Sequence, residues 1–250
     1  MCKTTLDFTP NDINRLKEFV KQNQSKNYVE KREKRNVHLS LPEISRELMW
    51  ENQFDCLLTS CQKSGPNSQV AKFLHPNSFP FSLVECTKKK KYIEKFVTDT
   101  LYLYGGIRFS SKIGKYAANN FQWLDDGGWN YLESILNLLI NLRCRTPELS
   151  DKIIERKVSY LIMEKFCGIG TTQSRNYLQL LGLTRYEIPI SSRFLGWLKE
   201  FGIPIEIKPK ALSYPSTYDS VLDEIQELCV KLNILPCVLD ACVFTRNDDE

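Results

Sequence analysis

The chain has 250 residues, of which 42% are hydrophobic and 26% are charged, and its formal net charge is +4. This composition excludes a disordered chain and predicts a globular protein that buries about 70 to 75% of its unfolded surface. The odd count of nine cysteines, with no signal-peptide pattern, predicts reduced thiols in an intracellular protein, of the cytoplasm and nucleoid or of a nucleus.

Metal and membrane signals are weak. No Cys-x-x-Cys pair occurs, and His38 and His75 stand alone, so the pattern predicts no zinc site. The longest apolar run, Leu136 to Leu142, is interrupted by asparagines and is far shorter than a membrane span, so no membrane partner is expected.

The expected elements are almost all helices. Thr9-Pro10 starts a helix through Val20, with proline at its first position. Ser40-Leu41-Pro42-Glu43 offers a capping box for a helix through Trp50. The short strand candidate at Ile203 to Ile207 contains a proline, which favours an extended loop. Further helices are predicted over residues 52–62, 67–74, 91–104, 111–124, 129–142, 151–166, 171–181, 191–201, 217–232 and 236–244.

Positive charge is concentrated in two places. The segment Lys21 to Asn36 carries six basic and two acidic residues, and Lys88 to Lys91 is a run of four lysines. Such runs are either solvated surface or sources of salt-dependent affinity for a nucleic-acid backbone.

The segment Phe166-Cys167-Gly168-Ile169-Gly170-Thr171-Thr172 predicts a hairpin between two helices. The apolar stripe that begins at Ile153 ends near Cys167, and a second stripe begins at Thr171. Gly168 and Gly170 allow a tight turn with exposed amides. Unpaired amides at a helix start can bind a phosphate without a basic side chain, although a glycine-capped connection without a ligand fits the same spacing.

This hairpin resembles that of the helix-hairpin-helix DNA glycosylases, the superfamily of endonuclease III and the 8-oxoguanine glycosylases, and the resemblance extends from about Phe54 to Phe244. The family hairpin reads roughly Leu-Pro-Gly-Val-Gly-x-Lys, and a later Val-Pro-x-Asp carries the catalytic carboxylate. In the same frame, Thr172 stands at the lysine position, and Ser191 of Ile188-Pro189-Ile190-Ser191 stands at the aspartate position.

The resemblance implies an all-α, two-lobed helix-hairpin-helix glycosylase fold that binds double-stranded DNA as a monomer. Residues 44–185 would form a six-helix lobe that ends in the hairpin, and residues 1–43 plus 186–250 would form the second lobe. Three C-terminal cysteines are too few for the four-cysteine iron–sulfur cluster of some relatives. The family hairpin also binds a monovalent cation, K⁺ or Na⁺, through carbonyls that map to Glu164, Phe166 and Ile169.

Both substitutions change the expected chemistry. Threonine cannot form the imine through which the family lysine cleaves the strand, so Thr172 predicts a monofunctional enzyme. Serine offers no charge to the oxocarbenium-like sugar, a loss that typically costs about a hundredfold or more in rate. Two hypotheses follow: a glycosylase that flips a modified or damaged base and hydrolyses its N-glycosidic bond, or a degenerate relative that only binds DNA or lesions. The identity of the base, oxidised, alkylated or hypermodified, is left open.

A second match lies upstream, in Thr59-Ser60-Cys61-Gln62. In the family this frame ends in an amide that fills the gap left by the flipped nucleotide, so Gln62 is the candidate here. Four carboxylates are weighed as substitutes for the missing aspartate: Asp125 and Asp126, which fit a turn, Glu187, predicted to be a solvated loop charge, and Asp240 on a short helix. The predicted DNA-binding residues are Gly168, Ile169, Gly170, Thr171, Gln173, Ser174, Gln62, Ser60 and Ser64.

Overall fold

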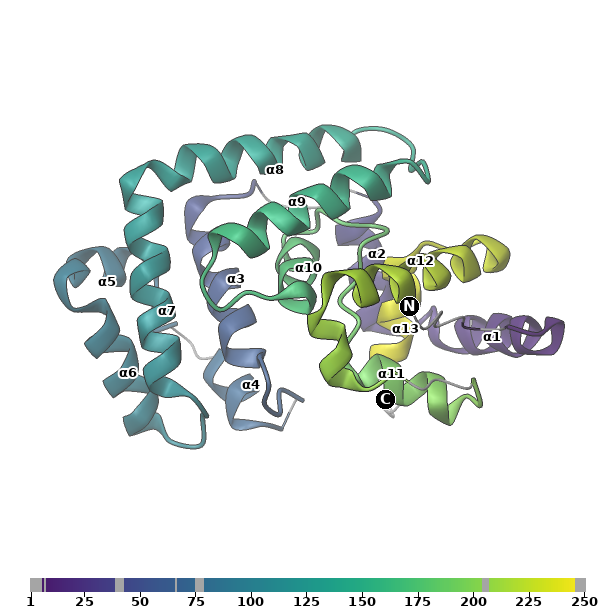
Figure 1. Ribbon diagram of the computed structural model, residues 1–250, viewed down its shortest axis with the longest axis horizontal. Helices are drawn as coiled ribbons and strands as arrows, with labels where there is room; N and C mark the ends of the chain where they lie inside the picture. Colours follow the sequence, from purple (N-terminus) through teal and green to yellow (C-terminus); the bar gives the residue numbers. More distant parts are fainter. Residues whose placement is uncertain are drawn as a thin grey trace.

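The computed structural model describes residues 6, 8–38, 43–65, 67–74, 79–203 and 207–245. Every regular element in these ranges is helical, which confirms the all-α prediction (Figure 1). The predicted capping box at Ser40 to Pro42, His75 and the centre of the Ile203 to Ile207 segment lie outside the described residues. The α-helices are α1 (Pro10–Asn23), α2 (Asn27–Asn36), α3 (Arg46–Thr59), α4 (Gln69–Leu74), α5 (Leu83–Lys88), α6 (Ile93–Tyr104), α7 (Ser110–Trp123), α8 (Trp129–Arg143), α9 (Asp151–Lys165), α10 (Thr171–Leu180), α11 (Ser192–Glu200), α12 (Pro215–Leu232) and α13 (Pro236–Thr245).

Three N-terminal elements differ from the prediction. A single helix, α3, replaces the two expected on either side of Glu51, and Ser45 caps it by accepting the Leu48 amide at 3.2 Å. The helices α2 and α5 were not predicted. The sequence of α2 is strongly polar, and the helix is held by burial of Val29 and by polar contacts of buried Arg32. Its partner is α13, far along the chain, so local periodicity does not reveal it.

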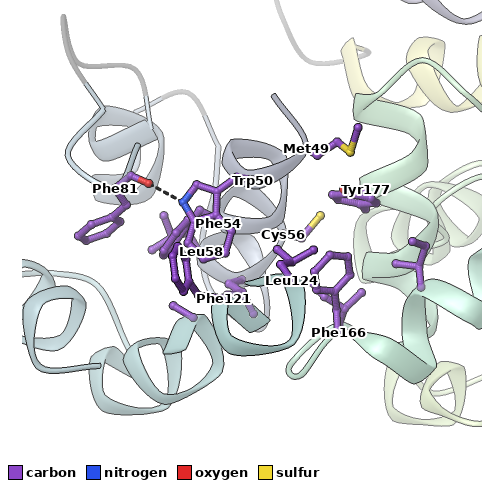
Figure 2. Packing of buried hydrophobic residues seen from close by; sticks show 14 of the residues in the cluster. Met49, Trp50, Phe54, Cys56, Leu58, Phe81, Phe121, Leu124, Phe166 and Tyr177 are labelled. Atoms are coloured by element: carbon purple, nitrogen blue, oxygen red, sulfur yellow. Dashed lines mark hydrogen bonds between the residues drawn. The ribbon is translucent and has the colours of Figure 1, made fainter. Parts of the chain in front are cut away.

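The buried hydrophobic residues form two clusters. The first extends from Met49 to Leu183 and includes a group of aromatic rings around Trp50, whose indole donates to the Phe81 carbonyl at 2.8 Å (Figure 2). The second combines residues 6–29 with residues 188–243. The chain passes from the first cluster to the second between Leu183 and Ile188, after α10. We keep the two-lobe division at residues 44 and 185 as a proposal.

None of the described helices is long and apolar enough to cross a membrane by itself. Taken together, α12 and α13 meet the criteria of length and composition, but the chain bends by 95° between them. Eight described cysteines are free thiols, and no group of three or more His, Cys, Asp or Glu side chains in the described ranges is placed to hold a metal ion.

Candidate nucleic-acid interface and reaction site

The hairpin turn requires glycine at position 168. The backbone of Gly168 has φ +83°, a conformation that L side chains rarely adopt. A methyl group added there would lie 2.4 Å from Tyr116 Cδ2 and 2.7 Å from Leu57 Cδ2. Both backbone conformation and packing therefore exclude a side chain, and Gly168 packs closely against α7 and α3.

Gly170 is different, because its own surroundings do not require glycine. It is exposed, has φ −96°, and a methyl group added to it would meet nothing within 4 Å. Gly170 is the N-cap residue of α10, and no side chain caps this helix. The first amides of α10 thus begin beside open space, which is the arrangement that binds anions at helix N-termini.

A buried asparagine of α7 holds the turn in place. The Oδ1 atom of Asn120 accepts the Cys167 amide at 2.7 Å, and its Nδ2 donates to the Cys167 carbonyl at 3.1 Å. Asn120 is 1% exposed, and the two hydrogen bonds give its buried amide group both a donor and an acceptor partner. We did not predict this contact from the sequence, although a polar residue on the apolar stripe of α7 is the signal that indicates it.

Two predicted DNA-binding side chains face inward. The Thr171 hydroxyl donates to the Leu212 carbonyl at 2.6 Å, and the Ser174 hydroxyl donates to the Thr171 carbonyl at 3.0 Å. Ser174 is fully buried, and its amide bonds to the Gly170 carbonyl at 2.8 Å. In this structure Ser174 therefore supports the first turn of α10 from inside, and Thr171 can meet a ligand only through its amide.

The upstream match lies beside the hairpin. The Gln173 side chain donates to the Thr59 hydroxyl at 3.5 Å, and the Cys56 thiol donates to the Gln173 carbonyl at 3.5 Å. The end of α3 thus adjoins the start of α10. Ser60 and Ser64, both half-buried, belong to the loop that follows α3.

The amide of Gln62 bridges two segments. Its Nε2 donates to the Leu58 carbonyl at 2.5 Å, and its Oε1 accepts the Arg108 amide at 2.8 Å. To enter a DNA duplex, Gln62 must release both partners. Next to Arg108 lies Phe109, which is 42% exposed and has φ +65°, an unusual combination for a bulky residue. We did not predict Arg108 or Phe109 as part of this surface.

The structure also brings Thr172 into contact with the segment that leads to Ser191. The Thr172 hydroxyl donates to the Ile190 carbonyl at 3.1 Å, directly before Ser191. The Tyr218 hydroxyl accepts the Ile190 amide at 2.6 Å and donates to the Ile188 carbonyl at 2.8 Å. Ser191 is the half-buried N-cap residue of α11, and its side chain caps none of the amides of that helix. Thr172 and Tyr218 therefore set the path of the chain that presents Ser191.

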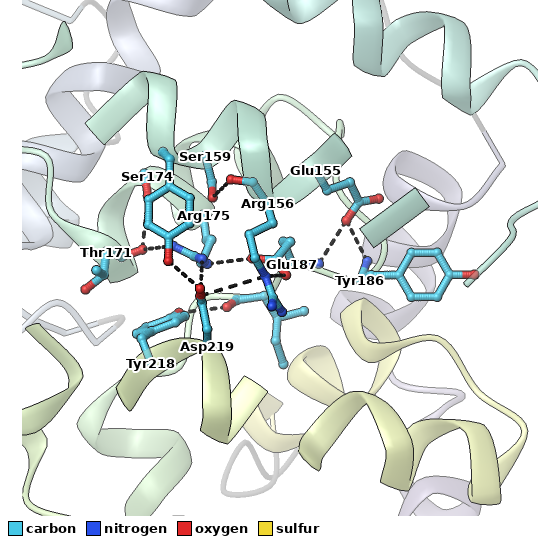
Figure 3. A network of polar contacts seen from close by, with 12 residues as sticks. Glu155, Arg156, Ser159, Thr171, Ser174, Arg175, Tyr186, Glu187, Tyr218 and Asp219 are labelled. Carbon is cyan, nitrogen blue, oxygen red and sulfur yellow. Dashed lines mark hydrogen bonds and ion pairs between the residues drawn. The ribbon is translucent and has the colours of Figure 1, made fainter. Parts of the chain in front are cut away.

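Buried charges join this segment to the hairpin (Figure 3). Arg175 of α10 is fully buried, and its guanidinium donates to Glu187 Oε2 at 2.8 Å and to Asp219 Oδ1 at 3.0 Å. The guanidinium also lies 4.4 Å from the ring centre of Tyr218. Arg156 donates to the second oxygen of Glu187 at 2.9 Å. Each carboxylate oxygen of Glu187 thus has a cationic donor, as a buried charge requires.

The prediction that Glu187 is a solvated loop charge is wrong. Its side chain is 0% exposed, and burial raises the pKa of its carboxyl above the usual value, although the charges of Arg175 and Arg156 act in the opposite direction. Its neighbour Glu155 accepts the backbone amides of residues 185, 186 and 187 at 2.8–2.9 Å. Burial raises the pKa of Glu155 to about 7 in spite of these three hydrogen bonds.

The other candidate carboxylates have partners elsewhere. Asp240 pairs with Arg32 at 2.8 Å and accepts Gln179 Nε2 at 3.0 Å. Asp125 and Asp126 lie in the turn between α7 and α8, where they contact Lys90 and Gln122. In the described part of the chain, no hydrogen bond links these three carboxylates to Thr172 or Ser191.

The carbonyls assigned to a monovalent cation belong to one short stretch. Glu164 lies in the last turn of α9, Phe166 is its C-cap residue, and Ile169 follows in the hairpin. The Phe166 carbonyl accepts the Ile169 amide at 3.4 Å. Binding of K⁺ or Na⁺ at this turn stays a prediction.

The arrangement of the helices and the hairpin is the fold of the helix-hairpin-helix DNA glycosylases of the 8-oxoguanine type. The 8-oxoguanine DNA glycosylase of Thermotoga maritima is similar over 95% of this chain and 98% of its own, with a TM-score of 0.63 and 15% sequence identity. The 8-oxoguanine DNA glycosylase of Methanocaldococcus jannaschii is similar over 95% of this chain and 94% of its own, with a TM-score of 0.62 and 16% identity.

A second structure from M. jannaschii, of the 8-oxoguanine glycosylase/lyase with a 15mer DNA that contains 8-oxoguanine, covers 93% of this chain and 97% of its own, with a TM-score of 0.61 and 15% identity. No protein-family model and no curated protein sequence matches this chain. At these identities the similarity establishes the fold.

Proposed function

We propose that this protein is a monofunctional DNA glycosylase that flips a modified base out of duplex DNA and hydrolyses its N-glycosidic bond. One observation carries the proposal. The start of α10 has no side-chain cap and is open at Gly170, and a hydrogen bond from the Thr172 hydroxyl to the Ile190 carbonyl joins it to the segment before Ser191. A phosphate-binding helix start thus adjoins a polar position at a second helix start. This is the juxtaposition that a DNA-bound nucleotide needs.

The hairpin would hold the DNA backbone. The amides of Thr171 and Thr172 begin α10 without a side-chain cap, and the missing side chain at Gly170 lets a phosphate oxygen approach them. The similar glycosylase from M. jannaschii was crystallised with DNA that contains 8-oxoguanine, which supports DNA as the ligand of this fold.

The reaction would be hydrolysis only. The bond between the sugar C1′ and the base nitrogen breaks, and its electron pair leaves with the base. A water oxygen then bonds to C1′ and loses a proton. Thr172 has no amine to attack C1′, so no imine forms and the strand stays intact. Ser191 can orient the water but adds no negative charge, so the reaction suits a base that leaves easily, such as a cationic alkylated purine.

The same residues favour a second candidate, a DNA-binding protein of this fold without catalysis. Two neutral hydroxyl side chains occupy the positions at which the family has lysine and aspartate. The Thr172 hydroxyl is already engaged by the Ile190 carbonyl, and Asp240 is neutralised by Arg32. Such a protein would recognise a lesion or a distorted duplex and leave it uncut.

Base release from a panel of duplexes tests the two candidates. Each duplex carries one oxidised, alkylated, deaminated or hypermodified base, and strand breaks are measured with and without alkali. Breaks that appear only after alkali treatment, and that weaken in Ser191→Ala, are expected for the monofunctional enzyme. Ser192→Ala is the matched control, because Ser192 is the exposed next residue of α11. Tight, salt-dependent binding without release from any duplex would select the second candidate.

A further inference from the structure

The exposed face of α7 carries a row of side chains that ends at the hairpin. Lys112, Lys115 and Asn119 are all exposed, and spacings of three and four place them on one stripe of the helix. At the far end of the row, Asn119 Nδ2 lies 3.9 Å from the thiol sulfur of Cys167 in the hairpin turn. The row therefore reaches the hairpin turn that precedes α10.

The other end of the row meets the segment that contacts Gln62. Arg108, whose amide donates to Gln62, is exposed, and its guanidinium lies 4.7 Å from the ring centre of Phe109. The Lys112 amine lies 5.9 Å from the same ring. We call Arg108, Lys112, Lys115 and Asn119 the α7 row. It connects the two segments that match the family, the end of α3 and the hairpin.

Within the described ranges, Arg108, Lys112 and Lys115 form no ion pair with a carboxylate. The four-lysine run behaves differently: Lys88 and Lys89 pair with Glu85 at 2.6 and 2.9 Å, and Lys90 pairs with Asp125. The carboxylate beside a paired cation repels a phosphate, so such a pair attracts the phosphate less than a cation without a carboxylate partner does.

We propose that the α7 row binds the phosphate backbone of duplex DNA, on a path that continues from the phosphate held by the hairpin. The inference rests on the proposed function for the presence of DNA at the hairpin. From Lys112 to Asn119 the helix axis rises by about 10 Å. One strand of B-DNA carries a phosphate for every ~3.4 Å of helix axis, and neighbouring phosphates lie farther apart than this because the strand winds around the axis, so the row is long enough to reach two neighbouring phosphates.

The salt dependence of binding tests this path. The double variant Lys112→Gln/Lys115→Gln is compared with Lys88→Gln/Lys95→Gln, which removes the same charge. Lys88 and Lys95 are exposed but pair with Glu85 and Asp99 one turn away on their own helices. Glutamine keeps helix propensity close to that of lysine, so both proteins should fold, and thermal unfolding verifies this.

The affinity for an undamaged duplex is measured at several KCl concentrations. We expect the slope of log K against log salt to become shallower by about 0.9 for each phosphate that a lysine no longer neutralises, or about 1.8 for the α7 variant. The control variant should keep the wild-type slope. Equal slopes for the two variants would overturn the proposal, as would a change confined to the control.

A parallel assay separates this inference from the proposed function. Single-turnover base release is measured for the wild type, because the hairpin and Ser191 carry the proposed function and the α7 row carries only this inference. If the wild type binds DNA and the α7 variant shows the expected slope change, but the wild type releases no base, the path along α7 holds and the glycosylase proposal fails. If the wild type does not bind duplex DNA, both fail.

Discussion

The two glycines of the hairpin should separate stability from DNA binding. In Gly168→Ala, the new methyl group would lie 2.4 Å from Tyr116 and 2.7 Å from Leu57, far inside van der Waals contact. The positive φ of +83° adds a backbone cost of about 1–2 kcal/mol for an L-residue. Overpacking of a tight core adds about 1–3 kcal/mol. The free energy of unfolding should therefore fall by about 2–5 kcal/mol.

Gly170→Ala should have the opposite profile. Its φ of −96° suits alanine, and nothing lies within 4 Å of the new methyl group. Stability should change by less than about 1 kcal/mol, because alanine restricts the unfolded chain but is less favourable than glycine at an N-cap position, and the two effects oppose each other. The methyl group would instead keep a phosphate from the first amides of α10. Loss of a hydrogen bond to a charged group, about 1.5–3 kcal/mol, corresponds to about 10- to 100-fold weaker DNA binding.

The assay combines thermal unfolding of both variants with titration of a fluorescent duplex at constant salt. For a chain of this length, each 1 kcal/mol of destabilisation lowers Tm by about 2–4 °C. The Tm of Gly168→Ala should thus be at least about 4 °C lower than that of the wild type. If Gly170→Ala binds DNA like wild type, no phosphate lies over the start of α10. If both variants lose the same stability, the packing argument for Gly168 is wrong.

Three further predictions follow from the buried polar groups. Tyr218→Phe removes both hydrogen bonds to the segment before Ser191, so base release should slow while DNA affinity is kept. The control is Tyr160→Phe, because Tyr160 also lies beside the Arg175 guanidinium but its hydroxyl donates to Asp219. This control should release base at the wild-type rate in the same single-turnover assay. Arg175→Met leaves a buried carboxylate without one cationic partner and should cost about 3–5 kcal/mol in urea unfolding. Burial raises the pKa of Glu155 from 4.5 to about 7, so between these pH values the folded protein keeps a proton that the unfolded chain releases. The contribution of this proton to stability is therefore complete below pH 4.5 and is lost as pH rises through about 7. The free energy of unfolding, measured across this pH range, should decline in the wild type but not in Glu155→Gln. A decline of equal size in the variant would assign the pH dependence to another group.

Several features could be predicted from the sequence because they depend on neighbours in the chain. The helices on either side of the hairpin were expected over residues 151–166 and 171–181 and occur at Asp151–Lys165 and Thr171–Leu180. Their apolar periodicity and the glycines between them are local signals. The same motif led to the glycosylase fold, and the similarity to three solved structures confirms the fold.

The tertiary structure decided which polar groups are buried and which charges are compensated. Glu187 looks like an exposed loop charge in the sequence, yet Arg175 and Arg156, from two different helices, enclose it. The run of four lysines is the strongest basic signal in the sequence, yet three of its members pair with carboxylates. The adjacency of Thr172 to the segment before Ser191 also depends on the packing of α10 against distant residues.

The physical reason is the same in each case. Helix formation and turn geometry are determined mainly by residues within about four positions of each other, so one sequence is enough to place them. The environment of a charge depends on everything within a few ångströms, and those groups come from segments that meet only when the chain has folded. The sequence by itself therefore determined that this chain forms a glycine hairpin between helices, and the folded structure decided which side chains near that hairpin are exposed and which are buried.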